Sequence, residues 1–446
     1  MLMKLLILGQ GGREHAMAWK LSLSDKVSEI YVCPGNAGTA LEERVYNIDI
    51  HINEYEKIIS FVKEKNIDLT IVGPEDPLCN GIADLFIKNK LKIFGPTKNL
   101  AQLEGSKVFS KNFMQENNIP SAEYKEFDDQ DTAVRYIENA KFPLVVKADG
   151  LAAGKGVIIC SDRSEAQNAI KKLLMSENSK KVVIENFLIG QELSAIYVCN
   201  FRGSGHEISL PWTKDYKSRD EYNAGPNTGG MGAVIHLMLD EHKNHIYKMH
   251  LEIEEILLKT IKGINYKYKN SDTNYTGFLY IGVMIDQNNK INVLEYNCRM
   301  GDPETQCLMM HLQNMKIDFL DLIDSDKLSV KKDMNLDYID KSKSYACTIV
   351  LAAQGYPGEY KKNLFIDLTK IIENEHLKIF HAGTTLEDGL IKSTGGRILS
   401  VNASGDSRDK CLQIAYDAIK NIGVYKDKNL SIKCQDHVFF REDIGE

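Results

Sequence analysis

A glycine-rich stretch between two apolar runs, PLVVKADGLAAGKGVIIC at 143–160, has the composition of a phosphate-binding turn. Backbone N–H groups of such a turn can approach phosphate oxygens because glycine lacks a Cβ, and lysines add positive charge. A Walker loop is excluded, because it needs four residues before its Gly-Lys pair and a hydroxyl after it. Three residues separate Gly150 from Gly154, and Gly156 follows Lys155. We predict a strand–turn–strand flap over nucleotide phosphates, with a solvated hairpin turn as the alternative.

The next apolar strand ends in residues that suit a purine nucleoside. In KKVVIENFLIGQELS, Glu185 ends the strand, Asn186, Phe187 and Leu188 follow, and Glu192 comes soon after. Adenine needs backbone donors and acceptors beside an apolar wall, and ribose needs a carboxylate acceptor. We predict a nucleoside-binding hinge here. The alternative is a surface strand with two ordinary glutamates.

A third string, NVLEYNCRMGDPETQ at 292–306, predicts a metal site. Glu295 and Asn297 stand two apart on an expected strand and therefore share one face. Two oxygen ligands near phosphates are how Mg²⁺ is held between protein and nucleotide. Arg299 and Asp302 follow closely and can supply charge to the same site.

The elements that must position these groups begin with a βαβ series. Apolar runs alternate with amphipathic stretches, which predicts a parallel, doubly wound α/β sheet. The expected strands lie at 4–9, 29–35, 68–75 and 92–96, and the expected helices at 13–22, 53–65 and 79–89. A helix over 106–118 should follow and end before Pro120.

Beyond residue 120 the pattern predicts a smaller α/β unit and then longer elements. The expected strands lie at 144–148, 157–160, 181–185, 277–286, 290–297, 345–352, 378–381 and 396–402, and the expected helices at 163–175, 240–262 and 406–420. A segment of low hydrophobicity, 325–343, predicts a domain boundary.

Length and composition limit the function classes. At 446 residues the chain should hold roughly two to four domains, and 43% hydrophobic with 26% charged residues is typical of a soluble globular protein. The net charge of −7 argues against a general nucleic-acid binder, and no apolar run reaches the ~18 residues that span a bilayer. Scattered cysteines without a CxxC pair, and an N-terminus unlike a signal peptide, favour a reducing cytoplasm.

Several longer strings, taken in order, resemble one family. They are GQGGREHA at 9–16, PGNAGT at 34–39, VGPEDPL at 72–78, LEGSK at 103–107, VKADGLAAGKGV at 146–157, AGPNTGGMGA at 224–233, LEYNCRMGDPETQ at 294–306, GYPG at 355–358, FHAGT at 380–384, GGR at 395–397 and REDIG at 441–445. Their joint order along the whole chain is highly specific. The chain resembles the ATP-grasp ligases and, within them, the phosphoribosylamine–glycine ligases (glycinamide ribonucleotide synthetases) of purine biosynthesis.

The resemblance implies an α/β fold with an N-terminal Rossmann-like domain (1–105), an ATP-grasp region (106–325) with a lid at about 121–190, and a small C-terminal α+β domain (340–446). It implies that ATP, glycine and 5-phosphoribosylamine give glycinamide ribonucleotide, ADP and phosphate through glycyl phosphate. The implied cofactors are ATP and Mg²⁺ or Mn²⁺. We expect small-molecule partners, no nucleic acid or membrane, a monomer or dimer, and a cytoplasmic location.

The resemblance also implies roles for residues. Arg299, Asp215 and Lys217 would be catalytic: Arg299 would stabilise charge on the transferred phosphate and the acyl oxygens, and Asp215 would bind the glycine ammonium. ATP would be held by Lys107, Lys147, Gly150, Gly154, Lys155, Gly156, Glu185, Asn186, Phe187, Leu188 and Glu192, and the metal by Glu295 and Asn297. The substrates would be held by Gly11, Gly12, Arg13, Asn36, Asp215, Asn227, Thr228, Gly229, Gly230, Met231 and Asp302.

One departure from the family pattern precedes the GPNTGGMG loop, where the family usually has Asp-His-Lys. This chain has TKDYK, with Tyr216 in the histidine position. Asp215 and Lys217 still match and keep their assignments, whereas residue 216 receives none.

Two other function classes fit parts of the sequence. An NAD-dependent dehydrogenase would use GQGGREHA as its fingerprint, but that needs a third glycine where Glu14 stands and an acid ending the second strand. We expect this loop and Arg13 to hold a sugar phosphate instead. A non-catalytic nucleotide sensor would not need the metal pair, Arg299 and the strand-end lysine together. We expect His381 to pack in the core, and His15 either to do the same or to reach the ribose phosphate.

Overall fold

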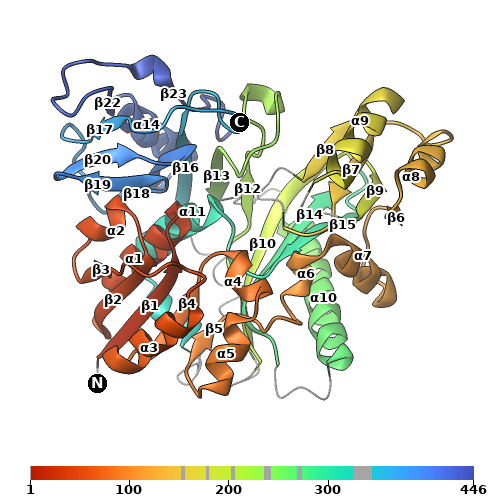
Figure 1. Ribbon diagram of the computed structural model, residues 1–446, viewed down its shortest axis with the longest axis horizontal. Coiled ribbons are helices and arrows are strands. Elements are labelled where there is room, and N and C mark those ends of the chain that lie inside the picture. The colour runs from red at the N-terminus through yellow and green to blue at the C-terminus, as the bar shows by residue number, and fades with distance from the viewer. Residues whose placement is uncertain are drawn as a thin grey trace.

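In the computed structural model the chain forms a large body with a smaller lid on one side (Figure 1). The structure describes residues 2–151, 156–176, 180–201, 206–235, 243–268, 274–324 and 344–446. The N-terminal region (red and orange) and the C-terminal region (blue) lie one above the other, and the lid stands on the opposite side (Figure 1). Gly154, Lys155 and the predicted boundary at 325–343 fall outside the described residues.

The N-terminal region is built on the predicted parallel sheet. Its described strands run in the order β3 (Val45–Asn47), β2 (Val27–Pro34), β1 (Met3–Gly9), β4 (Leu69–Val72) and β5 (Ile93–Phe94). The connecting helices are α1 (Gly12–Ser22), α2 (Ala37–Leu41), α3 (Tyr55–Lys65), α4 (Glu75–Cys79) and α5 (Ile82–Lys88). The predicted helix at 79–89 is wrong in its bounds, because Gly81, with φ of +92°, separates α4 from α5. The strand order reverses between β1 and β4, where such sheets bind ligands.

The lid is an antiparallel sheet whose two faces differ. Among the described residues its strands run β6 (Tyr124–Phe127), β9 (Val182–Asn186), β7 (Leu144–Ala148) and β8 (Val157–Cys160). Val146 and Ile184 belong to the core formed with α8 (Gln130–Ile137) and α9 (Arg163–Leu174). Because side chains alternate along a strand, Lys147 and Glu185 lie on the other face. Helix α7 (Lys107–Glu116) contacts β9.

A long antiparallel sheet joins the rest of the ATP-grasp region to the C-terminal region. In the described part of the chain its strands run β15 (Ile291–Asn297), β14 (Thr276–Ile285), β10 (Gln191–Asn200), β12 (Thr213–Asp215), β13 (Gly232–Ile235), β16 (Tyr345–Ala353), β21 (Arg397–Gly405) and β18 (Leu377–His381), with β11 (His206–Ser209) beside β10 and β23 (Val438–Phe439) beside β16. Strand β13 precedes residues 325–343 and strand β16 follows them, and the two strands pair. The sheet is therefore continuous across the predicted domain boundary. The domain division stays a prediction.

The remaining elements are helices and short strands, four of which, in the described part of the chain, form a separate antiparallel sheet within residues 365–425. They are α6 (Gln102–Gly105), η1 (Glu221–Asn223), α10 (Lys243–Lys267), α11 (Glu304–Asn314), α12 (Phe319–Ile323), β17 (Phe365–Asp367), β19 (Thr384–Glu387), β20 (Leu390–Ser393), α14 (Arg408–Ile419), β22 (Gly423–Tyr425) and η3 (Gln435–His437). Helix α11 contacts α1, β13, β16 and β21. One hydrophobic core contains Trp19 of α1, Met310 of α11 and Phe380 of β18, so the N-terminal and C-terminal regions share it.

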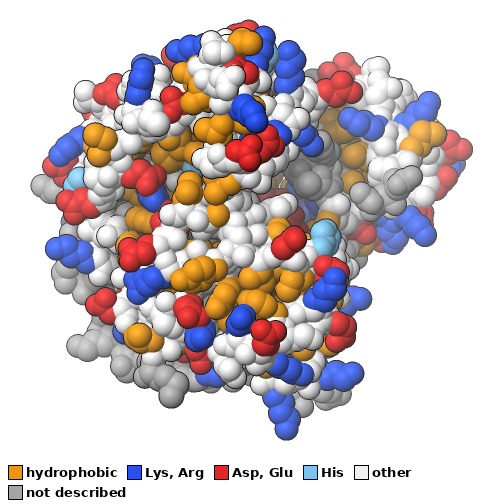
Figure 2. All heavy atoms as spheres, turned by 60° about the vertical axis from the view of Figure 1, so that its left-hand side comes forward, with side chains coloured by type: hydrophobic (Ala, Val, Ile, Leu, Met, Phe, Trp, Pro, Cys, Tyr) orange, Lys and Arg blue, Asp and Glu red, His pale blue; other side chains and the backbone are white. Residues whose placement is uncertain are grey.

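The surface shows no segregation of charge on the face drawn in Figure 2. There, lysine and arginine side chains are interspersed with acidic ones rather than gathered in a stripe (Figure 2). Nucleic-acid binders concentrate positive charge along one face, and the described residues visible here do not. A search of the described helices for one long and apolar enough to cross a membrane found none.

Candidate active site

Two lysines form ion pairs with one buried glutamate of the lid. Glu185 forms ion pairs with Lys147 of β7 and with Lys111 of α7, the latter at 2.6 Å. The Glu185 and Lys111 side chains are each 3% exposed. Burial raises the pKa of Glu185, but Lys147 and Lys111 lower it by more, so the carboxylate is ionised. The carboxylate predicted for ATP is thus committed to lysines, and the backbone of Glu185 is paired within the lid sheet.

The glycine turn begins beside this lysine cluster. Gly150 has φ of +97°, in the left-handed region that favours glycine, and its carbonyl accepts a hydrogen bond of 3.1 Å from Lys107 Nζ. The Asp149 carboxylate accepts hydrogen bonds from Ser106 and from the backbone of the first turn of α7. Gly156 closes the described part of the turn by accepting from Ala148 N at 2.8 Å.

The predicted hinge follows β9 directly. Asn186 is exposed, and its backbone N–H donates to Glu123 O at 3.0 Å; Phe187 and Leu188 are half-buried and give an apolar wall there. Glu192, at the start of β10, forms an ion pair with Lys217. Its carboxylate therefore already has a partner at the position predicted for ribose.

Strand β15 ends in the two predicted metal ligands. Glu295 and Asn297 lie on one face, while Tyr296 between them is buried in the core. The pairing of β14 with β15 slips by one residue next to Glu295, which leaves Leu294 as the extra residue of a β-bulge. The Leu294 carbonyl accepts a 3.4 Å hydrogen bond from Lys147 Nζ, so the lid lysine reaches the metal pair.

Glu295 is half-buried and stays ionised. Burial raises its pKa, but Lys217, Lys147, Lys107 and Arg299 together lower the pKa to about 2. Lys217 Nζ lies 3.5 Å from Glu295 Oε1. An ionised carboxylate surrounded by cations on the phosphate side is suited to share a divalent cation with a nucleotide.

Hydrogen bonding orients the amide of Asn297. With its nitrogen assigned from the network, Nδ2 donates to Tyr296 O at 3.1 Å and to Glu104 Oε1 at 3.0 Å. Oδ1 is then turned away from both acceptors and left for a ligand. Carboxylate and amide oxygens are hard ligands, which Mg²⁺ and Mn²⁺ prefer. Glu295 and Asn297 therefore fit such an ion.

Arg299 is held between two glutamates. Its Nε lies 3.2 Å from Glu75 Oε2, and its Nη2 lies 3.0 Å from Glu104 Oε1. Arg299 is the main reason that the pKa of Glu75 falls to about 2. Burial raises the pKa of Glu104 to about 7, although Arg299 lowers it. Both glutamates lie in strings that carried the resemblance, VGPEDPL and LEGSK, but the sequence assigned them no role.

Asp215 ends β12 with an unpaired oxygen. Among the described residues, its buried Oδ1 has no hydrogen-bond partner. Burial raises the pKa of Asp215 well above its usual range, and nearby Glu304 raises it further. Burial would lower the pKa of Lys217, but Glu192 and other acidic neighbours raise it instead. A buried acceptor without a partner marks a position for a donor such as an ammonium group.

The GPNTGGMG loop folds back over these two residues. Thr228 N and Thr228 Oγ1 both donate to Lys217 O at 2.8 Å. Gly230 has φ of +110°, and a Cβ there would lie 2.3 Å from Pro303 Cδ and 3.0 Å from Asp215 Oδ1. Glycine is therefore required at 230, and the space beside Asp215 is small.

Arg397 and Asp302 close the other side of the loop. Arg397 Nη1 donates to Gly229 O at 2.6 Å and to Asp302 O at 2.8 Å, and Nη2 pairs with Asp302 Oδ2 at 3.0 Å. The Tyr356 hydroxyl accepts from Gly229 N at 3.0 Å. Arg397 and Tyr356 lie in the motifs GGR and GYPG, which could have indicated these two residues from the sequence. No role was predicted for either. The other predicted loop residues are half-buried Asn227 and fully buried Met231.

The GQGGREHA loop is filled by Glu14. Gly11 N donates to Glu14 Oε2 at 2.6 Å, and Arg13 Nε lies 2.5 Å from Glu14 Oε1. Arg13 Nη1 donates to Met300 O at 3.2 Å, one residue from Arg299. A Cβ on Gly12 would lie 2.6 Å from a nitrogen of Gln306. A phosphate at Gly11 would have to displace the Glu14 carboxylate, so this assignment stays a prediction.

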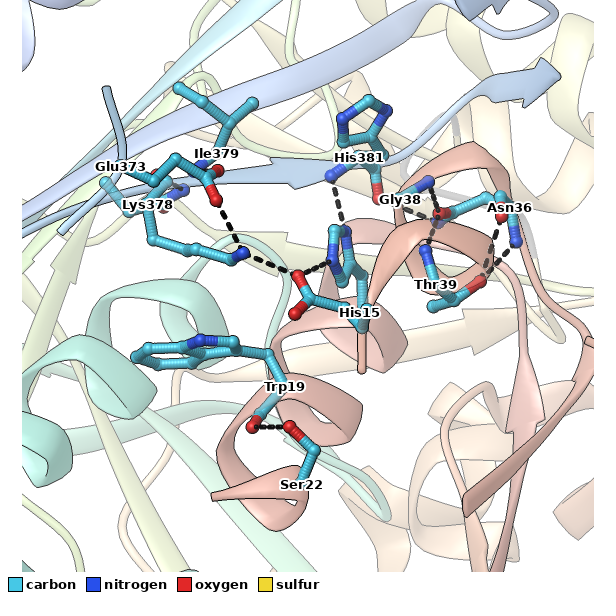
Figure 3. A network of polar contacts seen from close by, with 12 residues as sticks. His15, Trp19, Ser22, Asn36, Gly38, Thr39, Glu373, Lys378, Ile379 and His381 are labelled. Atoms are coloured by element: carbon cyan, nitrogen blue, oxygen red, sulfur yellow. Dashed lines mark hydrogen bonds and ion pairs between the residues drawn. The ribbon is translucent and has the colours of Figure 1, made fainter. Parts of the chain in front are cut away.

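Asn36 supports the neighbouring loop with its whole side chain (Figure 3). Its Oδ1 accepts from Gly38 N and Thr39 N at 2.8 and 3.0 Å, and its Nδ2 donates to His381 O at 2.8 Å. The side chain thus caps α2 and ties it to β18. Its predicted contact with ribose phosphate also remains a prediction, because the structure already satisfies the amide.

His15 links the same two regions (Figure 3). Its Nδ1 accepts from His381 N at 2.8 Å, and its Nε2 lies 3.0 Å from Glu42 Oε1, which also pairs with Lys378 at 2.6 Å. Burial lowers the pKa of His15, and burial together with His15 lowers that of His381 to about 3. Both histidines are buried, and with both ring nitrogens engaged His15 has a structural role rather than a free donor for phosphate.

Comparison with known proteins accounts for nearly the whole chain. Three models of phosphoribosylglycinamide synthetase match: the N domain at 3–104, the ATP-grasp (A) domain at 105–305 and the C domain at 346–446. The phosphoribosylamine–glycine ligase of Vibrio parahaemolyticus is 41% identical over 451 residues, covering 99% of this chain and 98% of that protein. The chain belongs to the phosphoribosylglycinamide synthetase family.

Solved structures agree with this family and with the fold class. The crystal structure of the phosphoribosylamine–glycine ligase of Thermotoga maritima has a TM-score of 0.78 at 30% identity and covers 99% of each chain. The biotin carboxylase domain of Hydrogenobacter thermophilus 2-oxoglutarate carboxylase, solved with MgADP, has a TM-score of 0.70 at 14% identity, covering 97% of this chain and 96% of that one. At that identity it supports the ATP-grasp fold alone. The predicted family, fold class and ligase class are confirmed.

Tyr216, where the phosphoribosylglycinamide synthetase pattern predicts histidine, faces away from the site. It follows the end of β12 and belongs to the hydrophobic core of the C-terminal region, where it is 3% exposed. The hydroxyl accepts from Gly445 N at 2.9 Å and donates to Glu446 O at 3.0 Å. The departure therefore affects how the chain packs around the loop and not the groups that line the site.

Proposed function

We propose that this protein joins glycine to 5-phosphoribosylamine at the expense of ATP, giving glycinamide ribonucleotide, ADP and phosphate in purine biosynthesis. The observation that carries the proposal is the position of Lys217. It lies 3.5 Å from Glu295 of the metal pair and two residues from Asp215, whose buried oxygen has no partner among the described residues. One side chain thus links a nucleotide–metal site to a site for an ammonium group.

The lid lysines hold ATP in this proposal. Lys147 and Lys107 contact the phosphates, and Gly150 and Gly156 lie at the two ends of the glycine-rich segment. Because phosphoryl transfer leaves little covalent chemistry to the protein, the rate depends on alignment and on charge stabilisation. Glu185 fixes Lys147 for this task, and residues 186–188 contact the adenine ring.

Glycine is activated before it is joined. Its carboxylate is a poor acyl donor, so a carboxylate oxygen attacks the γ-phosphate and ADP leaves, giving glycyl phosphate. The nitrogen of phosphoribosylamine then attacks the acyl carbon, phosphate leaves, and the nitrogen loses a proton. Arg299 stabilises negative charge on the transferred phosphate and the acyl oxygens. The lid excludes water, which would hydrolyse the acyl phosphate.

A divalent cation, Mg²⁺ or Mn²⁺, belongs to this site. Glu295 and Asn297 would hold it through their oxygens, and when bound it would supply positive charge to neutralise the phosphates. The chain's own contribution is the ionised state of Glu295 and the orientation of the Asn297 amide.

The glycine site lies between β12 and the GPNTGGMG loop. Asp215 accepts hydrogen bonds from the glycine ammonium, and Lys217 faces the carboxylate side. Gly230 packs directly on Asp215 and Pro303, so a side chain on the amino acid would meet the loop backbone. Arg397 and Asp302 keep the loop in place from the C-terminal region.

Further parts of the proposal concern the molecule as a whole. We propose domains at 1–105, 106–325 and 340–446, a cytoplasmic location, and a monomer or dimer that binds neither nucleic acid nor membrane. The phosphate of phosphoribosylamine binds near Gly11, Gly12, Arg13 and Asn36, where displacement of the Glu14 carboxylate would free the backbone donor of residue 11.

A coupled assay for ADP tests the activity. ADP release should need ATP, glycine, 5-phosphoribosylamine and a divalent cation together, and should stop when any one is omitted. A nucleotide sensor would bind ATP and release no ADP under any of these conditions. ADP release that is independent of glycine, or that is supported equally by another amino acid, would refute the proposed substrates.

A further inference from the structure

The Glu104 carboxylate contacts three hydrogen-bond donors at the proposed metal and phosphate site. It lies in the short helix α6, far from β15 in sequence, and is buried. Its Oε2 accepts from Cys298 N at 2.7 Å. Its Oε1 lies 3.0 Å from Arg299 Nη2 and accepts from the Asn297 amide at 3.0 Å. One carboxylate therefore contacts three consecutive residues at the end of β15.

The contact with Asn297 decides which atom of the amide faces a metal ion. A side-chain amide presents oxygen on one side and nitrogen on the other, and turning it over exchanges a ligand for a group that cannot bind a cation. Here both acceptors, Glu104 Oε1 and Tyr296 O, lie on one side of Asn297. Of these two, Glu104 is the side chain that also pairs with Arg299 and accepts from Cys298 N, so its position is fixed independently of Asn297.

We propose that Glu104 is the positioning residue of the nucleotide–metal site: it keeps Asn297 Oδ1 turned toward the cation and holds Arg299 beside it. Glu104 touches neither nucleotide nor substrate and acts through these two side chains. The inference rests on the proposed function only in needing a metal–nucleotide site, and not on the identity of the acceptor substrates.

The substitution Glu104→Gln should reverse the amide of Asn297. The backbone N–H of Cys298 is fixed by the strand, so the single oxygen of the introduced glutamine would be retained as its acceptor. The new NH₂ group would then face Arg299 and Asn297. Asn297 can accept from that NH₂ only by turning its own oxygen toward residue 104, which points its NH₂ group at the cation.

The test is calorimetric titration of the full-length protein with ADP, with and without Mg²⁺. Glu104→Gln should reduce the Mg²⁺-dependent gain in ADP affinity by about 10- to 100-fold, the usual effect of losing an outer partner of a metal ligand. ADP affinity without Mg²⁺ should change little. The matched control is Glu75→Gln, which removes the other carboxylate on Arg299 (3.2 Å) and does not touch Asn297. It should leave the Mg²⁺-dependent gain near that of the parent.

A double-mutant cycle separates positioning from general damage to the site. The substitution Asn297→Asp offers oxygen on both sides, so an NH₂ group at 104 no longer costs a ligand. Glu104→Gln should therefore reduce the Mg²⁺-dependent gain in the parent but increase it in the Asn297→Asp background, where it also removes a carboxylate–carboxylate contact.

Equal losses in the two backgrounds would overturn the inference, as would an unchanged gain in Glu104→Gln alone. If the Glu104→Gln protein does not fold, the Asn297→Asp variant is compared with the Glu104→Gln/Asn297→Asp double variant. The inference then requires the double variant to bind Mg²⁺ and ADP more tightly than Asn297→Asp does. Equal binding there also overturns it. Because ADP binding is measured without glycine or phosphoribosylamine, these outcomes do not depend on whether the proposed reaction is correct.

Discussion

Replacing Glu185 by glutamine should loosen the lid sheet and weaken ATP binding together. The Glu185 carboxylate pairs with Lys147 and, at 2.6 Å, with Lys111, and the Lys111 and Glu185 side chains are each 3% exposed. Glutamine keeps the size and removes the charge, so two lysines would remain without their shared counter-ion. Removing one partner from a buried pair costs about 3–5 kcal/mol, because the remaining charge stays desolvated.

A matched control lies on the same sheet. Glu126 of β6 pairs with Lys181 at 3.8 Å, and these side chains are 40% and 41% exposed. Glu126→Gln should cost about 0–1 kcal/mol, since exposed pairs are screened by water. Both substitutions replace the same chemical group, so their difference reports burial and pairing.

The measurement must report on the lid alone, because a chain of several regions need not unfold in one step. Native-state hydrogen exchange of the amides in β7 and β9 gives the free energy of opening there. Glu185→Gln should lower protection by roughly two to three and a half powers of ten, since each factor of ten is about 1.4 kcal/mol. Similar protection in the Glu185 and Glu126 variants, with unchanged KM for ATP, would refute the reasoning.

The same pair predicts a pH dependence with a definite sign. The folded-state pKa of Glu185 is lowered by its lysines against the effect of burial. Its contribution is therefore present above the ordinary glutamate pKa and is lost as pH falls through the folded-state pKa. On the alkaline side, burial and Lys147 lower the pKa of Lys111, whereas Glu185 raises it. Without Glu185 that pKa falls further, so the deficit of the variant should shrink as pH rises through the lowered pKa of Lys111.

Three further predictions concern the site. Lys147→Ala should reduce kcat/KM for ATP by about 10- to 150-fold, from the ~1.5–3 kcal/mol of a hydrogen bond to a charged group; unchanged steady-state ATP kinetics would remove Lys147 from the phosphate site. Alanine should be about 10- to 200-fold poorer than glycine in kcat/KM because Gly230 packs on Asp215; comparable values would contradict the small pocket. Tyr216→His should lower the free energy of unfolding by about 1–3 kcal/mol because the hydrogen bonds of the hydroxyl are lost, while kcat changes little. A large fall in kcat at unchanged stability would place residue 216 in the site.

Local patterns were sufficient for several features. The apolar runs of the first hundred residues specify the parallel sheet, because period and length distinguish its strands from the helices between them. The E-x-N spacing placed Glu295 and Asn297 on one face, since alternation in a strand does not depend on what packs against it. The roles of individual residues and the domain bounds remain predictions.

The sequence by itself determined which side chains share a face and which family the motifs belong to; tertiary structure decided which partner each charge meets. Glu104 reaches Cys298 across 194 positions, and Arg397 reaches Gly229 across 168. No local period encodes such pairs. Glu185, which was expected to bind ATP, pairs with Lys147 and Lys111. Glu14, which had no assigned role, pairs with Arg13. The physical reason is that a buried charge must be paired wherever packing places it, and packing is settled by long-range contacts between elements.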